Sequence, residues 1–175
     1  LKAGTVLLQA PTGTGKTLML GRALEAATGT LPQPMVWLWF APFAGLVAQT
    51  RDALSAQCAG LRLRDLSTDR EAMTTRDGDV FVQTWASVAT NVKDARKIRS
   101  ESESVKSLDT MLEILREEGF RIGVVIDEAH IAFRSTTVAS QFYLEVLQPD
   151  ITLLATATPN DDRLQDFAKS AGLTV

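Results

Sequence analysis

The sequence has few of the residues that mark several classes of protein. Its 175 residues include one cysteine, Cys58, and one histidine, His130. A lone cysteine cannot form an internal disulfide, so we expect a reducing compartment and interpret Cys58 as a helix or core residue. The longest apolar runs, such as Met35–Phe40, are too short to cross a bilayer, and no secretory leader is evident. We therefore expect a cytoplasmic protein without a membrane partner.

An excess of basic residues is also missing. The chain has 18 Lys and Arg against 21 Asp and Glu, which gives a net charge of −3 and a sequence pI of about 5.2. Modules dedicated to nucleic-acid binding usually have a basic excess. The composition therefore argues against a large phosphate-binding face, and any nucleic-acid function has to be inferred from motifs.

The rest of the composition is typical of a globular domain. Hydrophobic residues make up 45% and charged residues 22% of the chain, and 175 residues suffice for one domain with a substantial core. We expect residues 1–175 to form a single domain. Because the chain begins at Leu1, we expect it to be a piece of something longer.

Apolar segments alternate with helical patterns along the chain, which predicts an α/β fold with a mainly parallel central sheet flanked by helices. Residues Trp37 and Trp39 lie in an apolar run typical of a strand buried on both faces, so we interpret them as core. Expected strands cover residues 5–9, 35–40, 61–66 (half-buried or at an edge), 79–83, 122–126 and 151–155. Expected helices cover residues 16–27, 44–57, 108–119, 138–147 and 161–170, with Leu108, Met111, Leu112 and Leu115 in the core.

Residues 91–107 differ from the rest of the chain. Four basic residues precede a Ser-Glu-Ser-Glu-Ser tract with few apolar residues. A solvated connection and a basic loop touching a nucleic-acid backbone both fit this pattern.

A glycine-rich segment lies between the first expected strand and the first expected helix, which is the context of a phosphate-binding loop. Gly13 and Gly15 allow the backbone N–H groups to turn towards phosphate oxygens. Lys16 places a positive charge at the β- and γ-phosphates, and Thr17 offers its hydroxyl to Mg²⁺. The segment reads Ala10, Pro11, Thr12, Gly13, Thr14, Gly15, Lys16 and Thr17.

Two carboxylates end another apolar strand. Asp127 and Glu128 directly follow Val124–Ile126. Ligands of open α/β sheets gather at the carboxyl ends of strands, so both acids are expected beside the phosphate-binding loop. Asp127 is predicted to hold Mg²⁺, and Glu128 to orient and deprotonate the attacking water. We interpret His130 as a residue that senses the γ-phosphate and contacts a neighbouring motif; the alternative is a structural histidine.

These segments together resemble superfamily 2 helicases of the DEAD/DEAH group. Residues 10–17 look like motif I and 127–130 like motif II. Residues 156–159, Thr-Ala-Thr-Pro, look like motif III with Thr in place of the commoner Ser, and 40–49 resemble motif Ia. The resemblance covers nearly the whole chain. Within this group, the sequence is most similar in character to the helicase (Res) subunit of type III restriction enzymes. It implies the first of two RecA-like domains, a three-layer fold with ATP and Mg²⁺ as ligands.

The resemblance also implies roles outside the phosphate site. Thr156 and Thr158 would couple ATP hydrolysis to movement. A single strand of nucleic acid would contact Pro42, Phe43, Ala44, Gly45 and Thr84 through backbone N–H groups and hydroxyls. Trp85 follows Thr84, so contact with nucleic acid and core packing are both open for this side chain. The adenine-reading glutamine motif and the arginine fingers of a second domain are missing, so we expect residues 1–175 alone to hydrolyse ATP very slowly.

The leading hypothesis is therefore a DNA helicase or translocase, in a system that could include a nuclease or methyltransferase partner. An RNA helicase of the same group is the nearest alternative; Asp-Glu-Ala-His and Thr-Ala-Thr modestly favour DNA. A phosphate-loop ATPase or kinase that is not a helicase would leave the Pro42 and Thr156 segments unexplained. A degenerate binding domain would leave the intact Lys16 and Glu128 unexplained.

Overall fold

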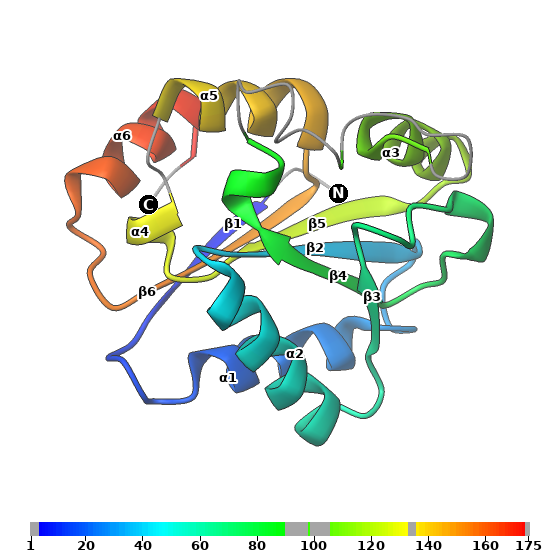
Figure 1. Ribbon diagram of the computed structural model, residues 1–175, viewed down its shortest axis with the longest axis horizontal. Coiled ribbons are helices and arrows are strands. Elements are labelled where there is room, and N and C mark those ends of the chain that lie inside the picture. Colours follow the sequence, from blue (N-terminus) through cyan, green and yellow to red (C-terminus); the bar gives the residue numbers. More distant parts are fainter. Residues whose placement is uncertain (1–3, 90–97, 99–105, 133–135, 174–175) are drawn as a thin grey trace.

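The computed structural model describes residues 4–89, 98, 106–132 and 136–173, and contains one six-stranded sheet (Figure 1). Every pair of neighbouring strands is parallel, and the strand order is β1-β6-β5-β2-β4-β3. The predicted α/β class is confirmed, and the sheet is wholly rather than mainly parallel. The strands are β1 Gly4–Gln9, β2 Met35–Ala41, β3 Arg62–Asp65, β4 Asp79–Thr84, β5 Arg121–Ile126 and β6 Ile151–Thr156.

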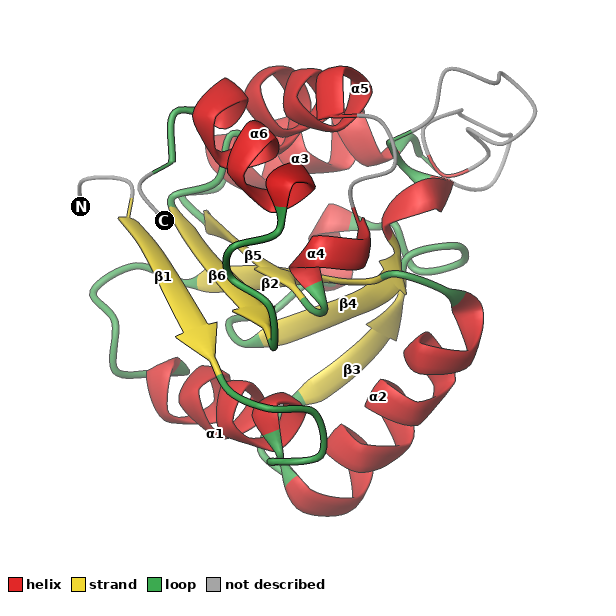
Figure 2. Cartoon of the chain, turned by 90° about the vertical axis from the view of Figure 1, so that its left-hand side faces the viewer, coloured by secondary structure: helices red, strands yellow, loops and turns green. Residues whose placement is uncertain are grey.

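Helices cover both faces of the sheet, which gives three layers (Figures 1 and 2). On one face lie α1 Lys16–Ala27 and α2 Ala44–Gln57. On the other lie α3 Leu108–Glu117, α5 Thr136–Gln141 and α6 Asp162–Ala171. Short helical turns are η1 Ala72–Thr74, η2 Trp85–Ser87 and α4 Ala129–Ala132. Within the described residues, no helix is long and apolar enough to cross a membrane.

Strand β2 lies inside the sheet, and all seven of its residues are buried. Because successive side chains of a strand point to opposite faces, β2 contributes to two separate cores. Trp37 and Trp39 pack with α1 and α2, whereas Leu38 and Phe40 pack on the opposite face. The interpretation of both tryptophans as core residues is confirmed.

The segment expected at a sheet edge forms β3, which is indeed the last strand of the sheet. Asp79, at the start of neighbouring β4, is fully buried and accepts hydrogen bonds from Arg62 and Arg64 of β3. A buried carboxylate is tolerated only with such partners. These ion pairs therefore fasten the edge strand to the sheet.

Helix α3 begins at Leu108, as predicted, and ends at Glu117, two residues before the predicted end. The hydroxyl of Ser107 accepts a hydrogen bond from the Thr110 N–H at the first turn. Gly119, with φ of 85°, follows the last turn in a left-handed conformation that favours glycine. The four apolar residues predicted for its buried face are all 0% exposed, namely Leu108, Met111, Leu112 and Leu115.

The helix expected over residues 138–147 differs from the structure. Helix α5 ends at Gln141, and Phe142–Leu147 continues as a π-helix (η5), with the Gln148 N–H bonded to the Tyr143 carbonyl at 2.9 Å. The wider turn lets Phe142 and Leu147, five residues apart, enter the same core. The basic part of the 91–107 segment lies outside the described residues.

The side chains of Trp85, for which the sequence left two roles open, and of Cys58, interpreted as a helix or core residue, are both buried. Trp85 is 3% exposed, and its ring makes edge-to-face contacts with Phe40, Phe142 and Phe167. It therefore packs in the core and is not available to nucleic acid. Cys58 is 1% exposed and directly follows α2, as expected for a core residue, and burial raises the pKa of its thiol.

Replacement of Gly123 by alanine should destabilise the sheet. A Cβ atom there would lie 2.2 Å from a ring carbon of Trp37, so the buried indole would have to move. We expect the free energy of unfolding to fall by about 1–3 kcal/mol, measured by urea denaturation. Gly45→Ala is the matched control, because its Cβ would meet only Phe43 at 3.9 Å. Equal stability of Gly123→Ala and the wild type would contradict the packing described.

Candidate nucleotide-binding site

The predicted phosphate-binding loop joins β1 to α1 at the carboxyl edge of the sheet (Figure 2). Gly13 and Gly15 have φ of 81° and 84°, and a Cβ on either would meet no atom within 4 Å. Glycine is therefore favoured there by backbone conformation and not by lack of space. Thr14 closes the turn by donating its hydroxyl and its N–H to the Pro11 carbonyl, at 2.7 and 3.4 Å.

Lys16 opens α1 and is only 6% exposed. Its Nζ donates to the carbonyl oxygens of Ala10 at 3.1 Å and Pro11 at 3.3 Å. It also forms an ion pair with Glu128 Oε1 at 3.5 Å. The ammonium group is therefore held inside the loop, on the same side as the acidic strand end.

Asp127 follows β5 and is 6% exposed. Its Oδ2 accepts the Thr17 hydroxyl at 3.3 Å, and its Oδ1 accepts the Glu128 N–H at 2.9 Å. Burial, and secondarily the charge of Glu128, raise the pKa of the Asp127 carboxyl. The group is thus a desolvated carboxylate beside a hydroxyl, in a place that favours an added cation.

The chemistry of these two residues suits Mg²⁺. Magnesium binds oxygen ligands and usually takes only one or two protein groups, with water and phosphate completing its octahedron. Thr17 and Asp127 supply two oxygens that already touch. Among the residues that the structure describes, no group of three or more His, Cys, Asp or Glu side chains is arranged around a metal ion.

Glu128 has an uncommon backbone conformation. Its φ is 46°, in the left-handed region that non-glycine residues rarely adopt. Such strain costs on the order of 1–3 kcal/mol and clusters at functional sites. The turn directs the carboxylate towards Lys16 on one side, at 3.5 Å, and towards His130 Nδ1 on the other, at 3.6 Å.

His130 connects the acidic strand end with the end of β6. Its Nδ1 lies 2.9 Å from the Thr156 hydroxyl, which also accepts the Thr158 N–H at 3.0 Å. Thr156 is fully buried, and its carbonyl accepts the Ala10 N–H of the phosphate-binding loop at 3.2 Å. His130 thus contacts the Thr-Ala-Thr segment at Thr156. The same residue, through its carbonyl, also contacts the phosphate-binding loop.

The residues expected to contact nucleic acid lie farther along the same edge. Ala41, the last residue of β2, pairs with Thr84, the last residue of β4, so the Pro42–Gly45 segment begins beside Thr84. Strand β2 also neighbours β5, and the Asp127 N–H donates to the Phe40 carbonyl at 2.9 Å. One strand therefore joins the two groups of candidate residues.

A cavity of about 530 Å³ opens beside His130. Gln9 and Asp161 line it, and neither was singled out from the sequence. Gln9 is a polar residue at the end of the apolar strand β1, and this feature of the sequence could have indicated it as a site residue. The cavity extends the candidate site past Thr158 towards the start of α6, through Thr158, Pro159 and Asn160.

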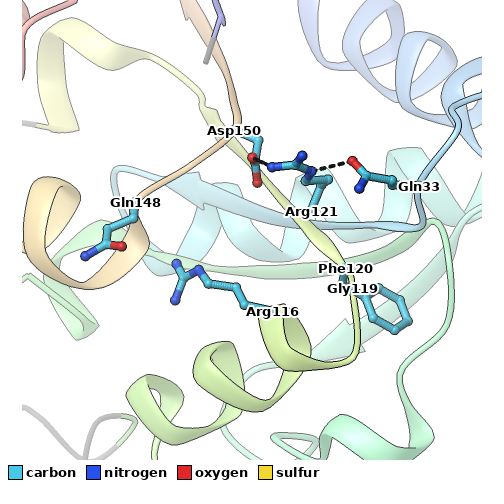
Figure 3. Close-up of a pocket in the computed structure, with 7 residues that line it drawn as sticks. All are labelled: Gln33, Arg116, Gly119, Phe120, Arg121, Gln148 and Asp150. Carbon is cyan, nitrogen blue, oxygen red and sulfur yellow. Dashed lines mark hydrogen bonds and ion pairs between the residues drawn. The ribbon is translucent and has the colours of Figure 1, made fainter. Parts of the chain in front are cut away.

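A second cavity, of about 350 Å³, lies at the opposite edge of the sheet (Figure 3). Arg121 there bonds Asp150 at 2.6 Å, and Arg116 donates to the Leu147 carbonyl at 2.6 Å. Ligands of parallel sheets bind at the carboxyl ends of strands, and this cavity adjoins the amino ends of β5 and β6. Its polar groups tie loops together, so we assign it a structural role.

The strand order, the three layers and the glycine-rich loop after β1 define a three-layer α/β domain of the phosphate-loop type, the fold that solved helicase and ATPase structures share. Residues 2–161 match the family described as "Type III restriction enzyme, res subunit". The chain belongs to this family. No curated protein matches the chain.

Solved structures show the same fold at low sequence identity. The UvsW helicase from bacteriophage T4 is 12% identical with a TM-score of 0.59, over 95% of this chain and 51% of that one. The Sulfolobus solfataricus SWI2/SNF2 ATPase core, solved with dsDNA, is 20% identical with a TM-score of 0.55, over 95% and 30%. The type ISP restriction-modification enzyme LlaGI, solved with a DNA substrate mimic, is 18% identical with a TM-score of 0.54, over 91% and 16%. The chain spans about half of UvsW and less than a third of the other two.

Asp127→Asn should stabilise the protein in EDTA. Because the folded state raises the Asp127 pKa, the ionised carboxylate costs stability as pH rises through that pKa. We expect the variant to exceed the wild type in free energy of unfolding at pH 7 to 8, and the gap to narrow below about pH 4. Urea denaturation at each pH measures this. A variant less stable than the wild type at neutral pH would contradict the desolvation described.

Proposed function

We propose that this chain is the ATP-binding motor domain of a DNA-dependent ATPase, a helicase or translocase. The observation that carries the proposal is the arrangement of one sheet edge. The phosphate-binding loop, the acidic end of β5 and the Thr156 segment lie at β1, β5 and β6, and the Pro42–Gly45 segment and Thr84 adjoin at β2 and β4.

In the proposed reaction, the phosphates of ATP occupy the loop, where Lys16 exchanges its carbonyl partners for phosphate oxygens. Thr17 and Asp127 would hold Mg²⁺, whose charge neutralises the β- and γ-phosphates. Glu128 orients the attacking water and accepts its proton. His130 lies between Glu128 and Thr156, so it is placed to pass a change at the γ-phosphate to the Thr156–Thr158 segment.

Nucleic acid is proposed to bind at Pro42, Phe43, Ala44, Gly45 and Thr84. This segment has small or neutral side chains, in agreement with a chain of net charge −3. Contacts would come from backbone N–H groups and the Thr84 hydroxyl and not from many ion pairs. DNA is favoured over RNA because the chain belongs to a restriction-enzyme family and two structures with a similar fold were solved with DNA or a DNA mimic.

A second RecA-like domain is proposed to complete the motor. The resemblance to two-domain helicases implies that this partner domain supplies arginine fingers to the γ-phosphate. A nuclease or methyltransferase partner fits the restriction-enzyme family of the chain. Cleavage and modification of DNA would belong to those partners.

Lys16→Ala and Glu128→Gln in the full-length parent protein should each abolish nucleic-acid-stimulated ATPase. Each removes one group that stabilises charge or orients water at the γ-phosphate, so we expect a loss of about 100-fold or more. The matched control is Lys169→Ala, an exposed lysine of α6. ATPase rates are compared with single-stranded DNA, duplex DNA, RNA and no nucleic acid.

Full stimulated activity of either variant would overturn the assigned chemistry. Stimulation by RNA alone would keep the motor and change its substrate. No stimulation of the wild type by any nucleic acid would overturn the proposed function.

Residues 1–175 alone should bind ATP in the presence of Mg²⁺ but hydrolyse it slowly. An arginine finger accelerates phosphoryl transfer by about 10³- to 10⁵-fold, so turnover should fall by this order relative to the full-length protein. Isothermal titration and a phosphate-release assay on the same preparation measure both properties. Turnover equal to that of the parent would contradict the need for a second domain.

A further inference from the structure

Helix α6 is hydrogen-bonded to the Thr-Ala-Thr-Pro segment that precedes it, residues 156–159. The Thr158 carbonyl accepts the Asp161 N–H at 3.3 Å, and the Pro159 carbonyl accepts the side-chain amide of Gln165 at 2.9 Å. The Asp161 carboxylate also caps the helix by accepting N–H groups of its first turn. Residues 156–159 and the start of α6 therefore form one hydrogen-bonded unit, so a shift of Thr158 displaces the helix with it.

The buried face of α6 contacts the turn that follows β4. Both elements lie on the same face of the sheet (Figure 1). Phe167 of α6 is 0% exposed, and its ring meets those of Trp85 and Tyr143 edge to face, with centroids 6.1 and 5.5 Å apart. Such contacts have a preferred geometry and contribute more than the area that they bury. The position of the Trp85 ring is therefore tied to that of α6.

Trp85 in turn holds the end of β4. It directly follows Thr84 and begins the short turn η2, and its ring also contacts that of Phe40 at 4.9 Å. The Ser87 hydroxyl donates to the Thr84 carbonyl at 2.7 Å, and the Thr84 N–H donates to the Gln83 side chain at 2.8 Å. Because both backbone groups of Thr84 are engaged in this way, Thr84 moves with the turn that contains Trp85.

The contacts thus run without a gap from the nucleotide site to Thr84. His130 contacts Thr156, and residues 156–159 are bonded to α6. From α6, Phe167 contacts Trp85, which adjoins Thr84. Protein interiors are close-packed, so a ring that is displaced moves its neighbours instead of compressing them. A change at the γ-phosphate that alters the contact between His130 and Thr156 can therefore reach Thr84 through these side chains.

We propose that Phe167 is a positioning residue, whose contact with Trp85 sets the placement of Thr84 according to the state of residues 156–159. The inference rests on the proposed function, because it takes Thr84 as a nucleic-acid contact and His130 as the sensor of the γ-phosphate. Phe167 lies outside the segments that resemble helicase motifs. Neither ring touches a substrate, and both act through Thr84.

The test measures a coupling factor in the full-length protein. This factor is the ratio of its affinities for a fluorescein-labelled DNA partial duplex, titrated by anisotropy, with and without Mg²⁺ and adenylyl imidodiphosphate. The variants are Phe167→Leu, Trp85→Leu and the double variant. Phe81→Leu is the matched control, because Phe81 is also 0% exposed and lies in the strand that ends at Thr84. Melting temperatures show that each variant is folded.

Phe167→Leu and Trp85→Leu should each reduce the coupling factor by about 2- to 30-fold, up to complete loss of coupling, and leave the affinity for the nucleotide analogue alone unchanged. Because both rings act through one contact, the double variant should lose no more coupling than the more severe single variant. Phe81→Leu should be destabilised to a similar extent and retain wild-type coupling. Wild-type coupling in Phe167→Leu, an equal loss in Phe81→Leu, or additive losses in the double variant would overturn the inference.

Gln165→Ala serves as a second variant in case the core variants do not fold. Gln165 is exposed, so its replacement removes the bond to Pro159 without opening a cavity. We expect it to reduce the coupling factor by at least about 2-fold, whereas Lys169→Ala on the same helix should not. Unchanged coupling in Gln165→Ala would overturn the inference when the core variants are unfolded.

Two results for the wild type separate this inference from the proposed function. A wild type that binds DNA and nucleotide without any coupling would overturn the positioning role and leave both binding sites. A wild type that binds neither DNA nor RNA, with or without the nucleotide analogue, would instead overturn the proposed function.

Discussion

The uniform direction of the six strands is the constraint on which the site depends. In a parallel sheet all carboxyl ends meet at one edge, so residues that follow different strands become neighbours without any contact in sequence. Thr17 and Asp127 are 110 residues apart and share a hydrogen bond for this reason. Reversal of one strand would move its terminal residue to the far edge, where Arg121 and Asp150 hold loops together.

The site holds two buried charged groups whose partners are unequal. Lys16 is satisfied by two loop carbonyls and Glu128, whereas Asp127 is buried with a raised pKa and a single hydroxyl partner from the loop. Lys16 thus has three oxygen partners, whereas the Asp127 carboxylate accepts hydrogen bonds, within the part of the chain that the structure describes, only from the Thr17 hydroxyl and the Glu128 N–H. The affinities for nucleotide and for Mg²⁺ should therefore be linked, since phosphate would pair with Lys16 and Mg²⁺ with Asp127 in the same site.

Much of this arrangement was readable from sequence because its signals are local. Alternation of strands and helices predicted the parallel sheet, and Gly13, Gly15 and Lys16 predicted the loop. Three features depend on tertiary packing and were not predictable. The π-helix at Phe142 follows from how the core is filled, the left-handed conformation of Glu128 from the turn after β5, and the exposure of Phe43 from its position between β2 and α2. The burial of Trp85 depends on contacts with aromatic rings distant in sequence, such as Phe40, so its sequence position alone did not decide between core packing and nucleic-acid contact.

Strand β2 carries a consequence of its own. Its Phe40 carbonyl holds the Asp127 N–H, and three residues later the chain reaches Phe43. One fully buried strand therefore adjoins both the proposed nucleotide site and the proposed nucleic-acid site. Any energetic coupling carried by it must be reciprocal: if a bound strand tightens ATP by some factor, ATP tightens the strand by the same factor. Hydrolysis of ATP would then weaken the binding of the nucleic-acid strand, and stepwise movement along that strand requires such weakening.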